Sequence, residues 1–385
     1  MSFTGYPRSD GSVGTRNLVG IISVVSCAND VVWWLSQKNK GCAVFLHGQG
    51  CCQSKPDADI TTRTLISLGC HPNLAAVLLV SLGCETVSVD IVAEGIARSG
   101  KRVEKTVIQK AGAPAAIKEG SRILKTMLSE AARVKREPFD DSQLILGVKC
   151  GASDTTSGLA PNPAVGGACD LLIDKGGMCV FGETTEFIGA EHILARRAAN
   201  PEVAKKIINI VERMEKRAID MGFDMRGGQP TAGNIAGGLT TIEEKSLGAI
   251  VKGGTRPIQD VYEYGERIQG KGLYIVDSPG REPEFLTAAA ATGAQVIVFT
   301  TGLGAPQGFP FVPVIKITGN PHTFRKLPDH MDMLIDIPGK GYTGISPASQ
   351  ALYDKILDVA SGEKTKAETL QYGNFPNIFT IGPTL

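Results

Sequence analysis

Long apolar runs alternate with amphipathic, helix-like segments along the whole chain. In the first third, unbroken runs of Val, Ile and Leu predict strands at residues 18–25, 43–46, 75–82 and 103–109. Segments with helical spacing lie between and after them, and the longest is 114–136. Apolar runs without polar alternation are typical of strands that are buried on both faces of a parallel sheet.

A second series of the same kind follows the charged stretch 135–141, which reads as a linker. Its strands are predicted at residues 144–149, 178–181, 273–277, 295–299 and 312–317. The pattern therefore predicts an α/β protein of two doubly wound domains with mainly parallel sheets, residues 1–138 and 142–385. Inside the second domain, the glycine-rich residues 222–254 are expected to form a loop that runs into a helix.

The composition narrows the class of protein. The chain has 385 residues, with 40 Lys and Arg against 39 Asp and Glu, and this balance gives no indication of a nucleic-acid partner. No apolar stretch reaches the roughly 18 residues of a membrane span, and residues 1–10 lack the apolar core of a signal peptide. Nine cysteines, an odd number, read as reduced thiols in such a chain. We therefore expect a cytoplasmic protein without a membrane span.

Four of the cysteines share one setting. Cys27, Cys51, Cys84 and Cys150 each follow a predicted strand and stand among small or polar residues, and His47 lies in the same loop as Cys51. The carboxyl ends of parallel strands are where open α/β sheets bind ligands. The four thiols are therefore candidates for a metal or iron–sulfur site. The alternative is that each is a small, buried apolar residue.

Three further loops combine small, hydroxylated and acidic residues at strand ends. The residues concerned are Ser153 and Asp154 after the first strand of the second domain, Glu183 and Glu186 after the next strand, and Thr301 and Gly302 after the strand at 295–299. Carboxylates in such positions suit a divalent cation or acid–base catalysis, and small-residue loops suit a bound carboxylate. Turns and helix caps are the alternative for all three loops.

The glycine-rich passage leads to a predicted helix N-terminus that carries Glu244 and Lys245, with Asn234 before it. Helix N-termini bind anions. A lysine in a desolvated site can act as a base or pair with a substrate carboxylate. A surface loop followed by a solvated, charged helix is the alternative.

Taken together, these segments resemble the altronate/galactarate dehydratase family of sugar-acid dehydratases. The matching motifs include Gly-Tyr-Pro-Arg at 5–8, His-Pro-Asn at 71–73, Gly-Cys-Glu at 83–85, the loops at 47–53 and 150–158, and the block 233–254. The resemblance covers essentially the whole chain, and the block 233–254 is its most specific part. It implies two Rossmann-like domains and an enzyme that converts an aldonate or aldarate, such as D-altronate, to a 2-keto-3-deoxy acid.

The resemblance also implies a metal, usually iron or manganese, and a partner. Longer members begin with a small β-rich domain, so this chain is similar to the large subunit of a split enzyme with a separate small subunit; a homo-oligomer is also expected. The family includes the large subunit of (2R)-sulfolactate sulfo-lyase, which releases sulfite and pyruvate. The cysteines at 27, 51 and 84 favour the sugar-acid branch, whereas the sequence Glu-Thr-Thr-Glu at 183–186 is more similar to the sulfo-lyase branch. A binding subunit that is inactive without its partner is the remaining alternative.

On this resemblance we form one hypothesis for the site. The metal ligands are Cys27, Cys51, Cys84 and Cys150, around Fe(II) or a [4Fe–4S] cluster; the rival is a mononuclear Fe(II) or Mn(II) site of His47, Asp154 and Glu183. Lys245, Glu244 and His47 are the expected catalytic residues. The expected substrate-binding residues are Ser153, Asp154, Asn234, Thr301 and Gly302.

Overall fold

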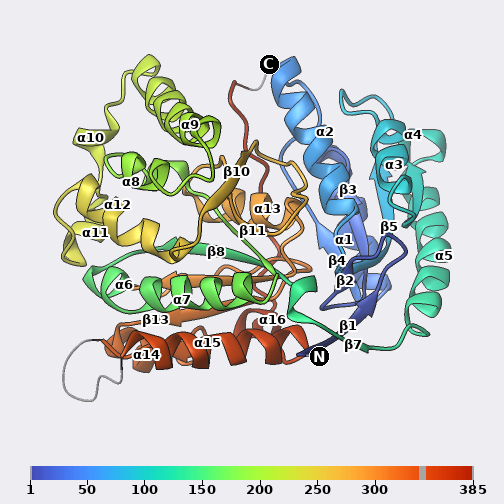
Figure 1. Ribbon diagram of the computed structural model, residues 1–385. Coiled ribbons are helices and arrows are strands. Elements are labelled where there is room, and N and C mark those ends of the chain that lie inside the picture. Colours follow the sequence, from blue (N-terminus) through green and yellow to red (C-terminus); the bar gives the residue numbers. More distant parts are fainter. Residues whose placement is uncertain (1, 338–343, 384–385) are drawn as a thin grey trace.

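The computed structural model describes residues 2–337 and 344–383, and it places two α/β units side by side (Figure 1). The first unit has a parallel sheet in the order β4-β3-β5-β6, made of β3 (Leu18–Ser23), β4 (Cys42–Phe45), β5 (Leu74–Ser81) and β6 (Arg102–Val107). One face is covered by α1 (Asn29–Lys38) and α5 (Ala113–Ala131), which follows the short α4 (Ile108–Ala111). The other face is covered by α2 (Lys55–Gly69) and α3 (Val89–Ala97). The first unit is therefore doubly wound.

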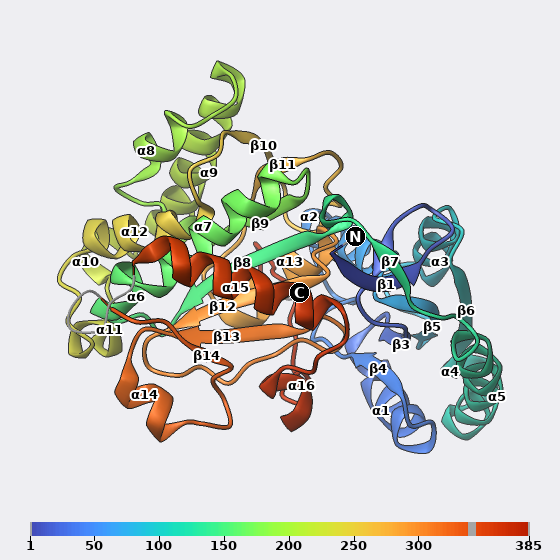
Figure 2. The ribbon, with the colours of Figure 1, turned by 60° about the horizontal axis from the view of Figure 1, so that its bottom comes forward.

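The second unit has a larger parallel sheet in the order β10-β11-β9-β8-β12-β13-β14 (Figure 2). Its strands are β8 (Ile145–Gly151), β9 (Met178–Phe181), β10 (Ile258–Tyr262), β11 (Gly272–Val276), β12 (Val296–Thr301), β13 (Val314–Thr318) and β14 (Met333–Leu334). One face packs against α7 (Pro161–Asp174) and α15 (Ile345–Ala360), and the other packs against α13 (Glu282–Ala291). The prediction of two Rossmann-like α/β units with parallel sheets is confirmed.

The remaining helices of the second unit are short, apart from one. They are α6 (Thr155–Leu159), α8 (Glu191–Ala195), α9 (Pro201–Asp220), α10 (Met225–Gly228), α11 (Ala232–Ala236), α12 (Ile242–Ile250), α14 (Pro321–Lys326) and α16 (Lys366–Leu370). The glycine-rich residues 222–254, expected to form a loop that runs into a helix, thus contain the short helices α10 and α11 before α12, and β10 is a strand that the hydrophobic pattern missed. Among the described residues, no helix is both long enough and apolar enough to cross a membrane.

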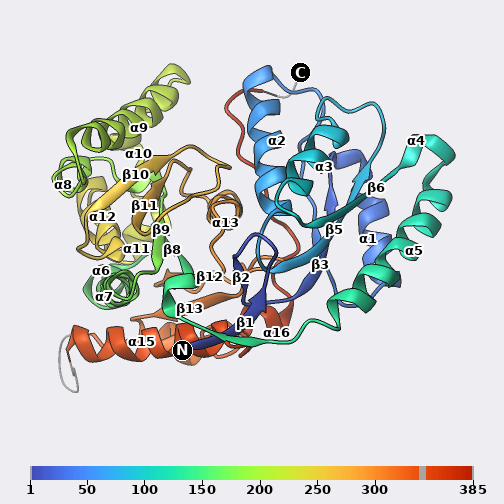
Figure 3. The same cartoon turned by 45° about the vertical axis from the view of Figure 1, so that its right-hand side comes forward.

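The two units share a hydrophobic core, and they are joined by a third, antiparallel sheet. The strands of this third sheet are β2 (Val13–Gly14), β1 (Phe3–Pro7) and β7 (Glu137–Phe139), in the order β2-β1-β7. The strands β1 and β2 lie between the two units in Figure 3. The predicted linker therefore contains a strand, because its backbone pairs with β1. Buried polar contacts also cross between the units: His71 Nε2 lies 3.0 Å from Ala294 O, and Asn73 Nδ2 donates to Gln295 O at 3.0 Å.

Candidate active site

The carboxyl ends of β8 and β9, neighbours in the large sheet, carry a fully buried ion pair. Lys149 Nζ donates to Glu183 Oε1 at 2.5 Å, and both side chains are 0% exposed. The backbone N–H of Cys150 donates to Glu183 Oε2 at 3.0 Å. Glu183 has a φ of 70°, which is rare for a residue with a side chain. Because this backbone turns sharply after β9, its carboxylate reaches back across to β8.

A second buried lysine completes the cluster. Lys252 lies in a single 3₁₀ turn (Val251–Gly253) that follows α12. Its Nζ donates to Glu183 Oε2 at 2.5 Å and to Glu186 Oε2 at 3.2 Å, and it lies 3.0 Å from Cys150 Sγ. The turn approaches α7 so closely that a Cβ on Gly166 would clash with the carbonyl of Val251. Glycine at 166 therefore allows Lys252 to enter the interior.

The charges of this cluster determine its protonation. Burial by itself would raise the pKa of Glu186, but Lys252, Lys245 and Lys149 outweigh it and hold the pKa at about 2. Burial and then the charge of Glu186 raise the pKa of the Cys150 thiol well above its usual value. Burial would lower the pKa of Lys252, but the acidic groups around it keep that pKa well above the usual value. At neutral pH Lys252 is therefore an ammonium group, Glu186 is a carboxylate, and Cys150 is a thiol that donates to Glu186 Oε2 at 2.7 Å.

The same cluster contains the one group of three possible metal ligands among the described residues. Ligand atoms of Cys150, Glu183 and Glu186 lie within 4.8 Å of one another. However, Lys252 Nζ already contacts all three residues, at 2.5–3.2 Å. A metal ion would add positive charge beside this ammonium group at contact distance, without water to screen it. The donor set therefore does not fit a metal ion while Lys252 is in place.

A pocket of about 450 Å³ lies beside the cluster. Its wall includes Ser153, Asp154, Glu244 and Lys245, together with the apolar residues Leu159, Leu239 and Leu247. Lys245 also faces the cluster, since its Nζ lies 3.8 Å from Glu186 Oε1 and its side chain is only 17% exposed. Lys245 thus connects the buried charges to a space in which a small polar ligand can bind.

The predicted substrate-binding residues meet at one end of this pocket, where they form a tight frame. Asp154 caps α6: its Oδ1 accepts from the backbone N–H groups of Thr156 and Ser157, and its Oδ2 accepts from Asn320 at 2.9 Å. Asn234 Nδ2 donates to Ser153 O at 2.9 Å.

The loop after β12 completes this frame. A Cβ on Gly302 would clash with the side chain of Asp154, and Thr301 Oγ1 accepts from the N–H groups of Gly304 and Ala305. The structure therefore brings Ser153, Asp154, Asn234 and Gly302 together, and it engages Asp154, Asn234 and Thr301 in contacts within the protein.

The other two predicted catalytic residues lie in different settings. Glu244 lines the pocket, and its Oε2 accepts from the backbone N–H of Thr240 at 2.7 Å, just before α12. His47 lies in the first unit, where Nε2 is 2.8 Å from Ser23 O and Nδ1 accepts from Gln49 N–H at 3.1 Å. Burial lowers the pKa of His47 to about 4. Because both ring nitrogens have protein partners, His47 in this geometry fixes a loop and offers no free nitrogen.

The proposed ligand sets are not assembled as expected. Cys150 is buried in the second unit with Lys252, whereas Cys27 and Cys84 are exposed and Cys51 is partly exposed in the first unit. His47, Asp154 and Glu183 each belong to a separate hydrogen-bond network, so the rival mononuclear set is not brought together either. The physical reason is that the end of a strand determines the position of a residue's backbone, whereas the direction of its side chain depends on tertiary packing.

Sequence reasoning missed the importance of Lys149 and Lys252. Both are next to segments that the sequence singled out, but a lysine is usually solvated and nothing in the pattern marks it as buried.

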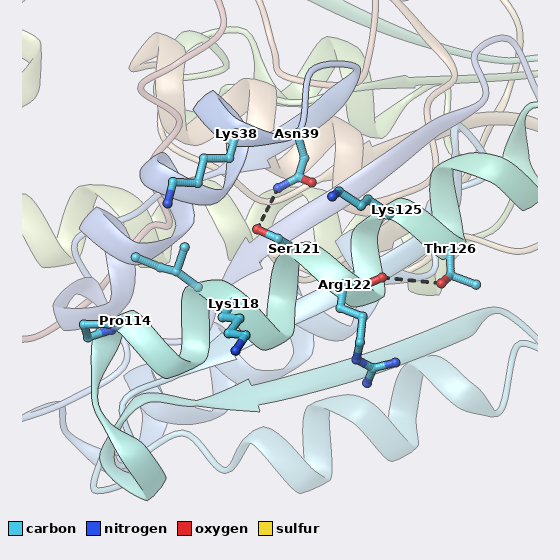
Figure 4. Close-up of a pocket in the computed structure, with 9 residues that line it drawn as sticks. Lys38, Asn39, Pro114, Lys118, Ser121, Arg122, Lys125 and Thr126 are labelled. Atoms are coloured by element: carbon cyan, nitrogen blue, oxygen red, sulfur yellow. Dashed lines mark hydrogen bonds between the residues drawn. The ribbon is translucent and has the colours of Figure 1, made fainter.

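A larger pocket, of about 620 Å³, lies between α1 and α5 on the outer face of the first unit (Figure 4). Its wall is made of Lys38, Lys118, Arg122 and neighbouring residues, and it shares no residue with the cluster.

Comparison with known proteins identifies the family. The model described as "D-galactarate dehydratase/Altronate hydrolase, second domain" matches residues 5–132, and the one described as "D-galactarate/Altronate dehydratase, C-terminal" matches residues 141–383. The (2R)-sulfolactate sulfo-lyase subunit beta of Chromohalobacter salexigens is 39% identical over 97% of this chain and 96% of its own length.

Two dehydratases are similar over nearly the whole chain as well. The altronate dehydratase of Bacillus subtilis is 33% identical, over 100% of this chain and 78% of its own length. The galactarate dehydratase (L-threo-forming) of Escherichia coli is 33% identical, over 99% of this chain and 77% of its own length. With both halves matched and such relatives along its length, the chain belongs to the D-galactarate/altronate dehydratase family, and it is a lyase.

Proposed function

We propose that the protein dehydrates a sugar acid, an aldonate or aldarate such as D-altronate, to a 2-keto-3-deoxy acid. The observation that carries this proposal is Lys245, which faces the pocket on one side and the buried Lys252–Glu186 pair on the other. An ammonium group held in place by buried charges costs little reorganisation when the reacting molecule gains negative charge.

Dehydration requires three contributions from the protein. The proton on C2 must go to a base, the enediolate that forms must be stabilised, and the C3 hydroxyl must leave with a proton as water. We assign the proton for the leaving hydroxyl to Lys245. Glu186 and Lys252 act on it as positioning residues, because Glu186 Oε1 lies 3.8 Å from Lys245 Nζ and Lys252 holds the other carboxylate oxygen.

The C2 proton is assigned to a carboxylate on the pocket wall. Asp154 and Glu244 are the acidic residues of that wall. Asp154 already accepts several bonds as a helix cap and from Asn320, so protonating it would break the frame of the pocket. Glu244 accepts from Thr240 through Oε2, whereas Asp154 accepts through both of its oxygens. Oε1 of Glu244 can therefore take the proton, and Glu244 is the base in this proposal.

A sulfo-lyase is the second candidate, since one observation favours it. The match to the sulfolactate sulfo-lyase subunit beta spans 96% of that protein, whereas the matches to the dehydratases span 77–78% of theirs. The same elimination would then release sulfite in place of water and yield pyruvate. Because that relative is named as a subunit, we also propose a separate partner subunit for this protein.

The test is a substrate panel under anaerobic conditions with Fe(II): D-altronate, galactarate and sulfolactate, with the chain alone and with a candidate small subunit. Keto-acid without sulfite supports the dehydratase, and pyruvate with sulfite moves the protein to the sulfo-lyase. Lys245→Ala is expected to lower kcat/KM by about 100-fold or more, whereas Lys205→Ala, on the exposed side of α9, should leave it unchanged. Full activity of Lys245→Ala would overturn the assignment.

A further inference from the structure

Three loops at the carboxyl edge of the small sheet each carry a thiol. Cys27 follows β3, Cys51 follows β4 and Cys84 follows β5. Because β3 lies between β4 and β5 in the sheet, the three loops are neighbours. Cys27 and Cys84 are exposed, so they are not small apolar residues packed in a core, whereas Cys51 is partly exposed and also packs against the core of the first unit.

The loops are fixed to one another by the backbone. Ser26 N–H donates to Gln49 O at 2.9 Å, which joins the first loop to the second. Val87 N–H donates to Gly50 O at 3.1 Å, which joins the second to the third. Gly50 has a φ of 109°, and a Cβ there would clash with the carbonyl of Val24. The three loops are therefore already gathered before any ligand binds.

Polar neighbours contact two of these thiols. Cys51 Sγ lies 3.8 Å from Cys52 Sγ. Gln109 Nε2 donates to Cys84 Sγ at 3.2 Å. Thiolates are the ligands that iron–sulfur clusters use.

We propose that Cys27, Cys51 and Cys84 bind an iron–sulfur cluster in the first unit, and that Cys150 is not one of its ligands. A single tetrahedral ion with metal–sulfur bonds of about 2.3 Å needs its sulfur atoms about 3.8 Å apart. In the part of the chain that the structure describes, these three sulfur atoms are not all within even 4.8 Å of one another. A cluster with several irons spreads its thiolates over more space and so fits them better. Cys150 is excluded because its sulfur contacts Lys252 and Glu186 in a closed interior.

The test uses the full chain, purified without oxygen or reconstituted with Fe(II) and sulfide, and the readouts are iron, acid-labile sulfide and the electron paramagnetic resonance of the reduced sample. We expect about four irons and four sulfides per chain. Cys27→Ser, Cys51→Ser and Cys84→Ser should each lower both contents by about fivefold or more. Cys150→Ser and Cys70→Ser, a buried thiol between α2 and α3, should retain them.

Each other outcome overturns the proposal. Iron without sulfide would indicate a single ion, and neither iron nor sulfide in the reconstituted chain would mean that the thiols bind no cluster. If the Cys150→Ser variant lost the cluster, Cys150 would be one of its ligands. Circular dichroism of each serine variant without iron separates loss of the cluster from loss of the fold. Because these measurements do not depend on turnover, they stand whether or not the dehydratase assignment holds.

Discussion

Replacing Lys252 by methionine tests the buried cluster directly. The substitution keeps most of the side-chain volume but removes the ammonium group that contacts Glu183 and Glu186. Two carboxylates would then share Lys149 and Lys245 in an interior from which water is excluded. We expect the free energy of unfolding at pH 7 to fall by about 3–5 kcal/mol, the usual cost of removing one partner of a buried ion pair.

A separate argument gives a similar magnitude. The pKa of Glu186 is about 2 in the folded protein, against an ordinary value of 4.5. That difference is worth about 3 kcal/mol, although Lys245 and Lys149 contribute part of it. Because the folded pKa lies below the unfolded one, this stability is fully present above pH 4.5 and is lost as the pH falls toward 2. It should decrease by about 2 kcal/mol between pH 7 and pH 3.

The assay is urea unfolding, followed by circular dichroism, of the wild type and Lys252→Met from pH 7 to pH 3. The difference between the two unfolding free energies should become smaller as the pH falls, because a protonated Glu186 is no longer stabilised by the ammonium group of Lys252. Lys316→Met is the matched control: Lys316 is also buried, but burial lowers its pKa to about 7 and its Nζ donates to a backbone carbonyl, that of Gln307. Below pH 6 the difference in unfolding free energy between Lys316→Met and the wild type should narrow less than that for Lys252→Met, because Lys316 interacts with one carboxyl group, that of Asp332, whose pKa burial raises. A Lys252→Met effect under about 1 kcal/mol at pH 7, or a gap that does not narrow, would refute the reasoning.

Three further predictions concern the loops around the two sites. Glu244→Gln should lower kcat by about 100-fold while thermal unfolding is nearly unchanged, because an amide still accepts from Thr240; full kcat would remove Glu244 as the base. His47→Gln should cost about 1–3 kcal/mol in urea unfolding at pH 7, and less between pH 6.5 and pH 4, where protonation of the unfolded wild-type histidine already weakens folding; an equal cost at both pH values would argue against a buried neutral His47. Gly302→Ala should lower the unfolding free energy by about 1–3 kcal/mol and raise KM, since its Cβ would displace Asp154; wild-type KM and stability would show that this contact is not needed.

The sequence by itself determined the fold class and the family. Continuous apolar runs such as 75–82 have no polar face, so only a sheet covered on both sides can bury them, and β5 lies in that position. The sequence also identified Lys245, Asp154 and Glu183 as residues of interest, because each stands just after a strand or at a helix N-terminus. These signals are local, and they predict local structure, namely where strands end and where helices begin.

Only the tertiary structure decided which of these residues meet. The strand β8 brings Cys150 beside Lys252, which is 102 residues away along the chain, and that contact depends on how closely one turn approaches α7 at a glycine. His47 and Cys51 share a loop, yet one side chain turns inward and bonds to Ser23 while the other stays partly exposed. Periodicity specifies the face of an element. Contacts between distant segments instead depend on how the helices and strands pack, which cannot be predicted from the charge or the spacing of residues along the chain.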